Sequence, residues 1–324
     1  MKVIEYNKIG NPAEVLEIKD VPSRAPGDGE VRVQVLATPI HPSNLLQIAG
    51  QYGTMPKFPA SPGAEGVGKV VELGAGVSHL QVGQNVLLTG VGGTWREEIT
   101  ASAQAFIPVP DGDVEQLAMA VVNPLTAHLL LASIKDLNEG DWIIQSAANS
   151  AVGEYLIQLA AQRGIKTINV VRRESLAPRL TELGATVVLT DGPDLAERAK
   201  AATGGADIVF GIDSVGGETF ARMVQSLAYG ATLASYGVLS MQQPALDLVS
   251  VIFNDVKVQG FWLAKWFETA SPEDKQAAFG AIIPMIATGA ISSAIDSRFK
   301  LEDIAAAVTR AGAPGRDGKV LLTP

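Results

Sequence analysis

The 324-residue sequence contains no cysteine and only three histidines, His41, His79 and His128. Without cysteine the chain can form no disulfide, no thiolate nucleophile and no cysteine-ligated zinc site. The three histidines are too scattered along the chain to resemble a metal-binding motif. The sequence therefore predicts a protein that holds no metal.

Long apolar runs and positive charge are also scarce. No uninterrupted apolar run reaches membrane-spanning length, and strand-like Lys2–Tyr6 leaves no room for a signal or transit peptide, so a cytoplasmic location without a membrane partner is expected. With 25 Lys and Arg against 34 Asp and Glu, the net charge is −9. That balance disfavours nucleic acid as a partner, and a polyphosphate ligand would need a local basic cluster.

The hydrophobic fraction of 47% supports a well-packed globular protein, and the length suits two domains. Up to about residue 106, Gly- and Pro-rich turns separate strand-like Val31–Leu36, Gly66–Glu72 and Asn85–Leu88. We expect a partly barrel-like β domain there. The proline-rich stretch that follows the segment from His41 to Tyr52 is either a wall of a site or an ordinary surface connection.

The second half of the sequence alternates between strand-like and helix-like segments, which favours a doubly wound parallel sheet. The Leu246–Leu263 stretch looks like apolar strands at the sheet edge, where it could pair with a second copy of the chain. The expected strands are Trp142–Gln145, Thr167–Val171, Ala185–Leu189, Ala206–Asp213 and Ala231–Gly237, and the expected helices include Leu195–Ala202, Glu218–Leu227, Lys275–Thr288 and Leu301–Ala311.

The segment Asp141–Arg173 reads as one strand–turn–helix–strand unit. Its turn has small residues at the spacing of a dinucleotide fingerprint, with Ala148 and Ser150 in place of the first two glycines and Gly153 as the third. Small residues allow a sharp turn and let a pyrophosphate approach the N-terminus of the helix. The turn therefore predicts dinucleotide binding, although three glycines would be a stronger signal.

The second strand of this unit ends in Arg172 and Arg173, where an NAD-binding fold commonly places an acidic residue. Arginines at that position suit the 2′-phosphate of NADPH instead. The adjacent Glu174 argues against strict selectivity for NADPH, and the alternative is that the two arginines are a solvated loop pair.

Motifs along almost the whole chain resemble those of the medium-chain dehydrogenase/reductase superfamily. They are NPLTA (123–127), AANSAVG (147–153), IDSVGG (212–217), SYG (235–237), GFW (260–262) and GKVLL (318–322). The finer resemblance is to zinc-free quinone oxidoreductases and mitochondrial-type trans-2-enoyl-CoA reductases. It implies an α/β protein with a GroES-like, partly open β-barrel catalytic domain (1–122 and 265–324) and a Rossmann NADPH-binding domain (123–264). Gly63-Ala64-Glu65 stands where zinc-dependent members carry Gly-His-Glu.

The resemblance also implies roles for individual residues. Tyr52 inherits the role of the catalytic tyrosine, and the alternative is a loop aromatic packed on the prolines. A homodimer is implied as well. The implied NADPH-binding residues, together with the fingerprint glycine, are Asn123, Asn149, Ser150, Ala151, Val152, Gly153, Arg172, Arg173, Tyr236, Gly237, Phe261, Trp262, Leu263 and Lys319.

Three functions stay open at this point. The first is an NADPH-dependent reductase of trans-2-enoyl thioesters, in which hydride goes to the β-carbon and a proton to the α-carbon. The second is an NADPH-dependent quinone or 2-alkenal oxidoreductase, and both act on a small-molecule substrate. The third is a cofactor-binding protein without significant turnover. His128 and Asp213 are interpreted as structural, and Glu65 as a residue that orients the backbone or pairs with an arginine.

Overall fold

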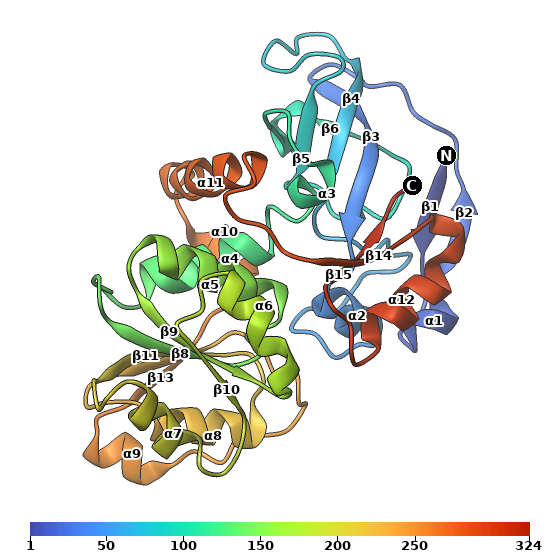
Figure 1. The fold of residues 1–324 in the computed structure, drawn as a ribbon. Coiled ribbons are helices and arrows are strands. Elements are labelled where there is room, and N and C mark those ends of the chain that lie inside the picture. The colour runs from blue at the N-terminus through green and yellow to red at the C-terminus, as the bar shows by residue number, and fades with distance from the viewer. The chain divides into compact units, whose positions relative to one another are not determined.

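The computed structural model describes residues 1–324 and divides into two compact units (Figure 1). Unit 1 comprises Met1–Val122 and Phe279–Pro324, and unit 2 comprises Asn123–Ala278. The second division falls within helix α11 (Pro272–Ala287), later in the chain than the expected return at residue 265. No helix of the chain has both the length and the apolar character needed to cross a membrane.

Unit 1 is built around a seven-stranded sheet in which β3 is the longest strand. β3 alternates buried and less buried residues over its first half and pairs antiparallel with β4, β6 and β15. In spatial order the strands are β14 (Ile295–Phe299), β15 (Lys319–Leu322), β3 (Glu30–Pro39), β4 (Val67–Leu73), β5 (Asn85–Leu88) and β7 (Phe106–Pro108), with β6 (Glu98–Ser102) also on β3.

Two hydrophobic clusters hold unit 1 together. One lies on the sheet around Val33, Val86 and Phe106, and the other joins the two-stranded sheet to the helices around Ile4, Trp95 and Val308. The C-terminal strand β15 therefore returns to the first β domain, as the sequence predicts. The remaining elements are β1 (Lys2–Glu5), α1 (Pro12–Val15), β2 (Glu17–Asp20), α2 (Pro42–Ile48), η1 (Ala103–Ala105), α3 (Val114–Leu117), η3 (Leu301–Asp303) and α12 (Ile304–Gly312).

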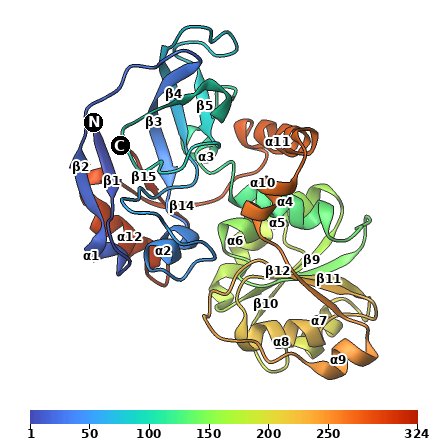
Figure 2. The same cartoon turned by 180° about the vertical axis from the view of Figure 1, so that it is seen from behind.

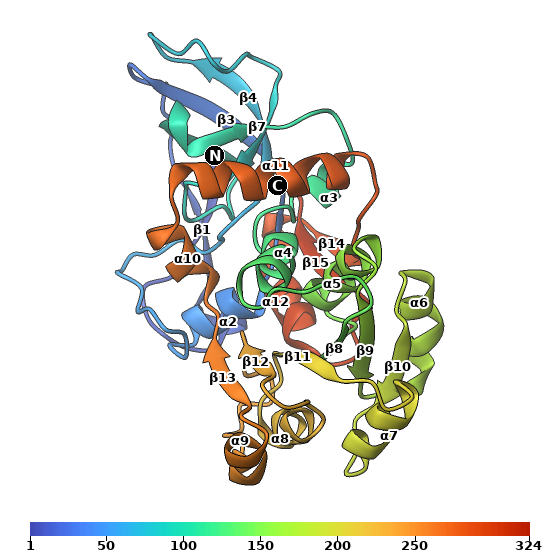
Figure 3. The same cartoon turned by 90° about the vertical axis from the view of Figure 1, so that its left-hand side faces the viewer.

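Unit 2 is a six-stranded parallel sheet with helices on both faces (Figure 2). Figure 3 shows the strands side by side from β13 at one edge to β10 at the other. Spatially they follow the order β10 (Val187–Thr190), β9 (Lys166–Val171), β8 (Trp142–Gln145), β11 (Ile208–Asp213), β12 (Thr232–Ser235) and β13 (Lys257–Gly260). This order is that of the Rossmann fold, in which ligands bind at the carboxyl ends of the strands where the strand order reverses.

Helices α4 to α6 cover one face of this sheet and α7 to α9 the other (Figure 1, Figure 2). The apolar runs of β8 and β11 are buried between the two helical layers, as expected for a parallel sheet. The helices are α4 (Asn123–Ser133), α5 (Ala151–Gln162), η2 (Glu174–Leu176), α6 (Ala177–Glu182), α7 (Leu195–Ala202), α8 (Gly217–Gln225), α9 (Leu248–Phe253), α10 (Leu263–Thr269) and the first part of α11.

The prediction for Leu246–Leu263 is wrong in part. Only β13 within it is a strand, because Leu248–Phe253 forms helix α9 and Leu263 begins α10. The side chain of Asp247 accepts a hydrogen bond from the backbone of Val249 and so caps α9. A capping carboxylate at the first turn outweighs the β preference of this Val- and Ile-containing stretch.

Candidate cofactor-binding and active-site residues

The turn after β8 has the geometry of an anion-binding helix entry. Ala147 adopts a left-handed backbone conformation with φ of 45°, which reverses the chain. Ser150 is the N-cap of α5, and its Oγ accepts a hydrogen bond from the backbone of Gly153 at 3.2 Å. The first turn of α5 therefore begins at Ala151 with the partial positive charge of a helix N-terminus.

Position 153 requires glycine because the backbone of the preceding turn lies very close to it. A Cβ atom at this position would lie 2.5 Å from the carbonyl oxygen of Ala148, well inside van der Waals contact. The third fingerprint glycine is thus retained because it lets α5 pack directly against the turn. The first two glycine positions of the fingerprint can be occupied by Ala148 and Ser150, because neither residue adopts the left-handed conformation. That conformation falls on Ala147.

The carboxyl ends of β8 and β11 are tied together by Asp213. Its Oδ1 accepts hydrogen bonds from the Ser146 hydroxyl at 2.6 Å and from the backbone of Val215, and its Oδ2 accepts one from the backbone of Gly216. Asp213 is fully buried. Its interpretation as a structural residue is confirmed by these bonds, which fix the loop between β11 and α8.

Tyr236 and Gly237 follow β12 at the same edge of the sheet. Burial raises the pKa of the Tyr236 hydroxyl, while the neighbouring hydroxyls of Ser214 and Ser150 act in the opposite direction. A Cβ atom on Gly237 would lie 3.0 Å from the carbonyl oxygen of Ser214. The structure thus brings Ser150 of the turn and Tyr236 of the next loop together.

Arg172 and Arg173 directly follow β9 and are both exposed, as is Glu174. Neither arginine forms an ion pair with a carboxylate, so both guanidinium groups are available to an anion. A cavity of about 200 Å³ lies beside them, lined by Val171, Glu174, Ala177, Val188, Leu189, Thr190 and Arg198.

The side chain of Asn123 contains a buried hydrogen-bond donor without an acceptor. Its side chain opens α4 and is 5% exposed, yet its Nδ2 atom has no hydrogen-bond acceptor. A buried donor without an acceptor costs about 1–3 kcal/mol, so a ligand carbonyl is a fitting partner. Together with the turn before α5, this unpaired donor fits a nicotinamide dinucleotide. Asn149 lies in that turn, Ala151 and Val152 begin α5, and Phe261, Trp262 and Leu263 follow β13.

Lys319 lies in unit 1, on β15, in a buried polar cluster that the sequence does not reveal. Its Nζ lies 3.2 Å from Nδ1 of His41, and Nε2 of His41 lies 2.6 Å from Oε1 of Glu65. Because an ammonium group only donates, Nδ1 of His41 accepts and Nε2 donates to Glu65. All three side chains are at most 6% exposed.

Glu65 anchors this cluster to the backbone. Its Oε2 accepts hydrogen bonds from the backbone of Val121 at 2.7 Å and of Val122 at 2.8 Å. The prediction that Glu65 orients the backbone is therefore confirmed, whereas the predicted arginine partner is wrong and the partner is His41. Burial lowers the pKa of His41, and the ammonium group of Lys319 lowers it further.

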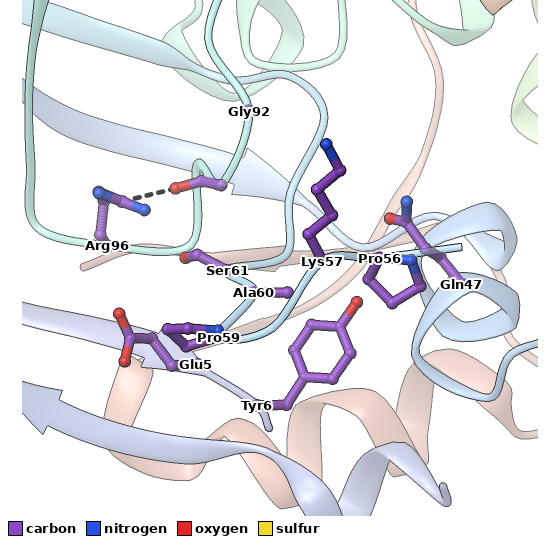
Figure 4. Close-up of a pocket in the computed structure, with 11 residues that line it drawn as sticks. Glu5, Tyr6, Gln47, Pro56, Lys57, Pro59, Ala60, Ser61, Gly92 and Arg96 are labelled. Atoms are coloured by element: carbon purple, nitrogen blue, oxygen red, sulfur yellow. Dashed lines mark hydrogen bonds between the residues drawn. The ribbon is translucent and has the colours of Figure 1, made fainter. Parts of the chain in front are cut away.

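Tyr52 lies half-buried in the irregular segment between α2 and β4 of unit 1. The prolines that follow it line a pocket of about 430 Å³ (Figure 4). The proline-rich stretch is thus the wall of a pocket. No single sequence motif contains its other polar lining residues, because they come from four separate segments. They are Glu5, Tyr6, Gln47, Lys57, Ser61 and Arg96.

No group of three or more histidine, aspartate or glutamate side chains is arranged to hold a metal ion. His41 is engaged with both Glu65 and Lys319.

Two family models match the chain, one for each unit. The model of zinc-binding dehydrogenases matches residues 151–279, and that of the alcohol dehydrogenase GroES-like domain matches residues 27–111. The fold and these matches define the class of GroES-like plus Rossmann oxidoreductases. The chain belongs to the medium-chain dehydrogenase/reductase superfamily.

Within that superfamily the similarity extends to enoyl reductases. The mitochondrial enoyl-[acyl-carrier-protein] reductase of Rattus norvegicus is 35% identical over 330 residues, covering 100% of this chain and 88% of that protein. The structure of Etr1p with NADP and crotonyl-CoA is 28% identical in sequence and has a TM-score of 0.91. The match covers 100% of this chain and 99% of that chain. The Etr1p/Etr2p heterodimer of Candida tropicalis gives the same values. An NADPH:quinone reductase from Bacillus thuringiensis has 32% identity and a TM-score of 0.91, with coverage of 100% and 98%.

Proposed function

We propose that the chain is an NADPH-dependent, zinc-independent reductase of activated carbon–carbon double bonds, with trans-2-enoyl thioesters as its substrates. The observation that carries this proposal is whole-length similarity to enoyl reductases. The resemblance assigns the role of the catalytic tyrosine to Tyr52. When bound, NADPH supplies the hydride that adds to the β-carbon. A proton from the protein or from water adds to the α-carbon, which yields the saturated thioester and NADP⁺.

The proposed roles of the protein are to hold the cofactor and to stabilise the enolate. In unit 2 the N-terminus of α5 and the turn before it bind the pyrophosphate, and Arg172 and Arg173 bind the 2′-phosphate. The unpaired Nδ2 of Asn123 donates to a cofactor carbonyl. Tyr52 donates a hydrogen bond or a proton to the developing enolate, because a phenol is protonated at neutral pH.

We propose the other NADPH contacts on the resemblance. They involve Tyr236, Gly237, Phe261, Trp262 and Leu263 at the carboxyl ends of β12 and β13, and Lys319 in the cluster with His41. The enoyl reductase of Rattus norvegicus is mitochondrial by name. A cytoplasmic location of this chain stays a prediction, which cell fractionation tests.

The assay that tests the proposal follows NADPH oxidation with crotonyl-CoA, a longer trans-2-enoyl-CoA and a small quinone, in parallel with NADH. Preference for an enoyl thioester with NADPH supports the enoyl reductase. Turnover of the quinone alone supports the second candidate, an NADPH-dependent quinone or 2-alkenal oxidoreductase, which the similarity to the Bacillus thuringiensis protein favours. Tight NADPH binding without oxidation by any acceptor would instead indicate a cofactor-binding protein.

Substitution of Tyr52 tests its proposed role. Loss of one hydrogen-bond donor to a developing oxyanion typically costs a factor of about 10²–10³ in rate, so Tyr52→Phe should lower kcat on crotonyl-CoA by that factor. Tyr229→Phe is the matched control, because the Tyr229 side chain in unit 2 is 78% exposed. Near-normal turnover of every enoyl substrate by Tyr52→Phe would show that Tyr52 is only a wall of the site.

A further inference from the structure

The pocket beside the proline-rich segment has an unusual charge balance for this acidic chain. Its charged lining residues are Lys57 and Arg96 against the single carboxylate of Glu5. The chain as a whole carries a net charge of −9. The pocket is thus a local positive site of the kind that a polyphosphate ligand needs.

Arg96 is only partly exposed and forms no ion pair. Its Nε donates to the carbonyl oxygen of Gly93 at 2.6 Å, which fixes the guanidinium group on the pocket wall. Burial lowers the pKa of Arg96, while the charge of Glu5 acts in the opposite direction. The remaining N–H donors of Arg96 have no acceptor in the protein, so an anion in the pocket would stabilise a guanidinium group that burial now disfavours.

Tyr6 adds a buried donor to the same pocket. The residue is 1% exposed, and its ring packs edge to face against Phe58 with a centroid distance of 5.7 Å. In Figure 4 the Tyr6 hydroxyl points toward Pro56 and Lys57, with the side chain of Gln47 nearby.

We infer that this pocket binds a phosphate group, namely the phosphate of the pantetheine arm that carries the thioester substrate. Arg96, Lys57 and the Tyr6 hydroxyl would donate to the phosphate oxygens. Glu5 can accept from a hydroxyl or amide donor of the arm, and Pro56 and Pro59 offer apolar surface to its methyl groups. This inference rests on the proposed function and names the part of the substrate that the protein recognises.

The position of the pocket in the chain agrees with this assignment. Lys57 and Tyr52 belong to the same irregular segment between α2 and β4 of unit 1. A phosphate held at Lys57 would therefore tether the arm on the segment that carries the proposed catalytic residue. The same phosphate occurs in coenzyme A and on acyl carrier proteins, so the pocket would serve both kinds of carrier.

The test compares thioesters that differ in the phosphate. The ratio of kcat/KM for crotonyl-4′-phosphopantetheine to that for crotonyl-pantetheine, which lacks only the phosphate, measures the contribution of the pocket. Because charge-assisted hydrogen bonds to the phosphate are lost, this ratio should fall about tenfold in Arg96→Gln and in Lys57→Ala. The control is Lys69→Ala, an exposed lysine on β4 that lies outside the pocket. An unchanged ratio in both pocket variants would overturn the inference.

Calorimetry with 4′-phosphopantetheine, pantetheine and adenosine 3′,5′-bisphosphate makes the test independent of turnover. We expect wild-type protein to bind 4′-phosphopantetheine, and Lys57→Glu and Tyr6→Phe to bind it at least tenfold more weakly. Binding of the adenosine compound alone would assign the pocket to the nucleotide end of coenzyme A and overturn the assignment to the arm. Binding of 4′-phosphopantetheine by a protein that reduces only quinones would refute the proposed function and leave the pocket assignment intact.

Discussion

At the scale of single residues, the buried polar groups divide into those that are paired within the protein and those that are not. His41 connects Glu65 and Lys319 through hydrogen bonds between segments that are far apart in the sequence. Asn123 Nδ2 is buried and has no partner in the protein. Because unpaired buried donors are rare in folded proteins, this atom is strong local evidence for a ligand.

The exposed arginines after β9 give a prediction about cofactor choice. Arg172→Ala and Arg173→Ala should each raise the Kd for NADPH about tenfold, because each removes a charge-assisted hydrogen bond to the 2′-phosphate. The Kd for NADH should change little, since NADH lacks this phosphate. Fluorescence titration of both cofactors measures the effect, with Lys200→Ala on the same unit as control. An equal loss of affinity for NADH and NADPH would contradict the 2′-phosphate role.

His41 gives a prediction about pH. In the folded protein burial and Lys319 lower its pKa, so its ring stays neutral, whereas in the unfolded chain it takes up a proton below about pH 6.5. The stability that depends on the neutral ring is therefore present above that pH and is lost as the pH falls below it. His128 contributes with the same sign, because burial and then Arg163 lower its pKa.

We expect the urea midpoint of unfolding to decrease as the pH is lowered from about 7 to about 5. This decrease should be smaller in His41→Gln than in the wild-type protein. Replacing His41 also weakens the cluster at every pH, so the readout is the change with pH and not the midpoint itself. His79→Gln serves as control, since His79 lies outside the cluster. If wild-type protein and His41→Gln lose stability with equal slopes, His41 does not carry the effect.

At the scale of secondary-structure elements, the sequence predicts most of what local chemistry decides. β5, β8 and α7 have the predicted bounds, because turns with glycine and short apolar runs define them. The helix α9 was not predicted, since one capping aspartate decides it against the preferences of the residues it caps. The cluster of His41 with Lys319 could not be predicted either, because it depends on the pairing of β15 with β3.

The turn between β8 and α5 gives a prediction for an element. Gly153→Ala should destabilise the protein by about 1–3 kcal/mol and weaken NADPH binding, because the added Cβ would lie 2.5 Å from the carbonyl oxygen of Ala148. Gly280→Ala in α11 is the matched control. A Cβ there meets no atom within 4 Å, and the substitution should stabilise the helix by about 0.5–1 kcal/mol. Urea denaturation should therefore shift in opposite directions for the two variants, and a shift in the same direction would contradict the packing argument.

At the scale of the whole molecule, unit 2 ends in an edge that the chain itself does not cover. All four residues of β13 are exposed, and its outer edge has no partner strand. The neighbouring helix α9 exposes Val249 by 65%, Ile252 by 66% and Phe253 by 73%. An unpaired edge strand beside an exposed apolar helix is a site for association. We propose a homodimer in which β13 pairs with its copy across a two-fold axis.

Light scattering tests this assembly. The 33.9 kDa chain should behave as a dimer, and Phe253→Glu or Val249→Glu should shift it to the monomer, because the dimer would bury the introduced carboxylate without a partner. Val82→Glu is the control, since Val82 is 63% exposed in unit 1 and lies far from β13 in the sequence. A wild-type monomer, or a Phe253→Glu protein that stays dimeric, would rule out this interface.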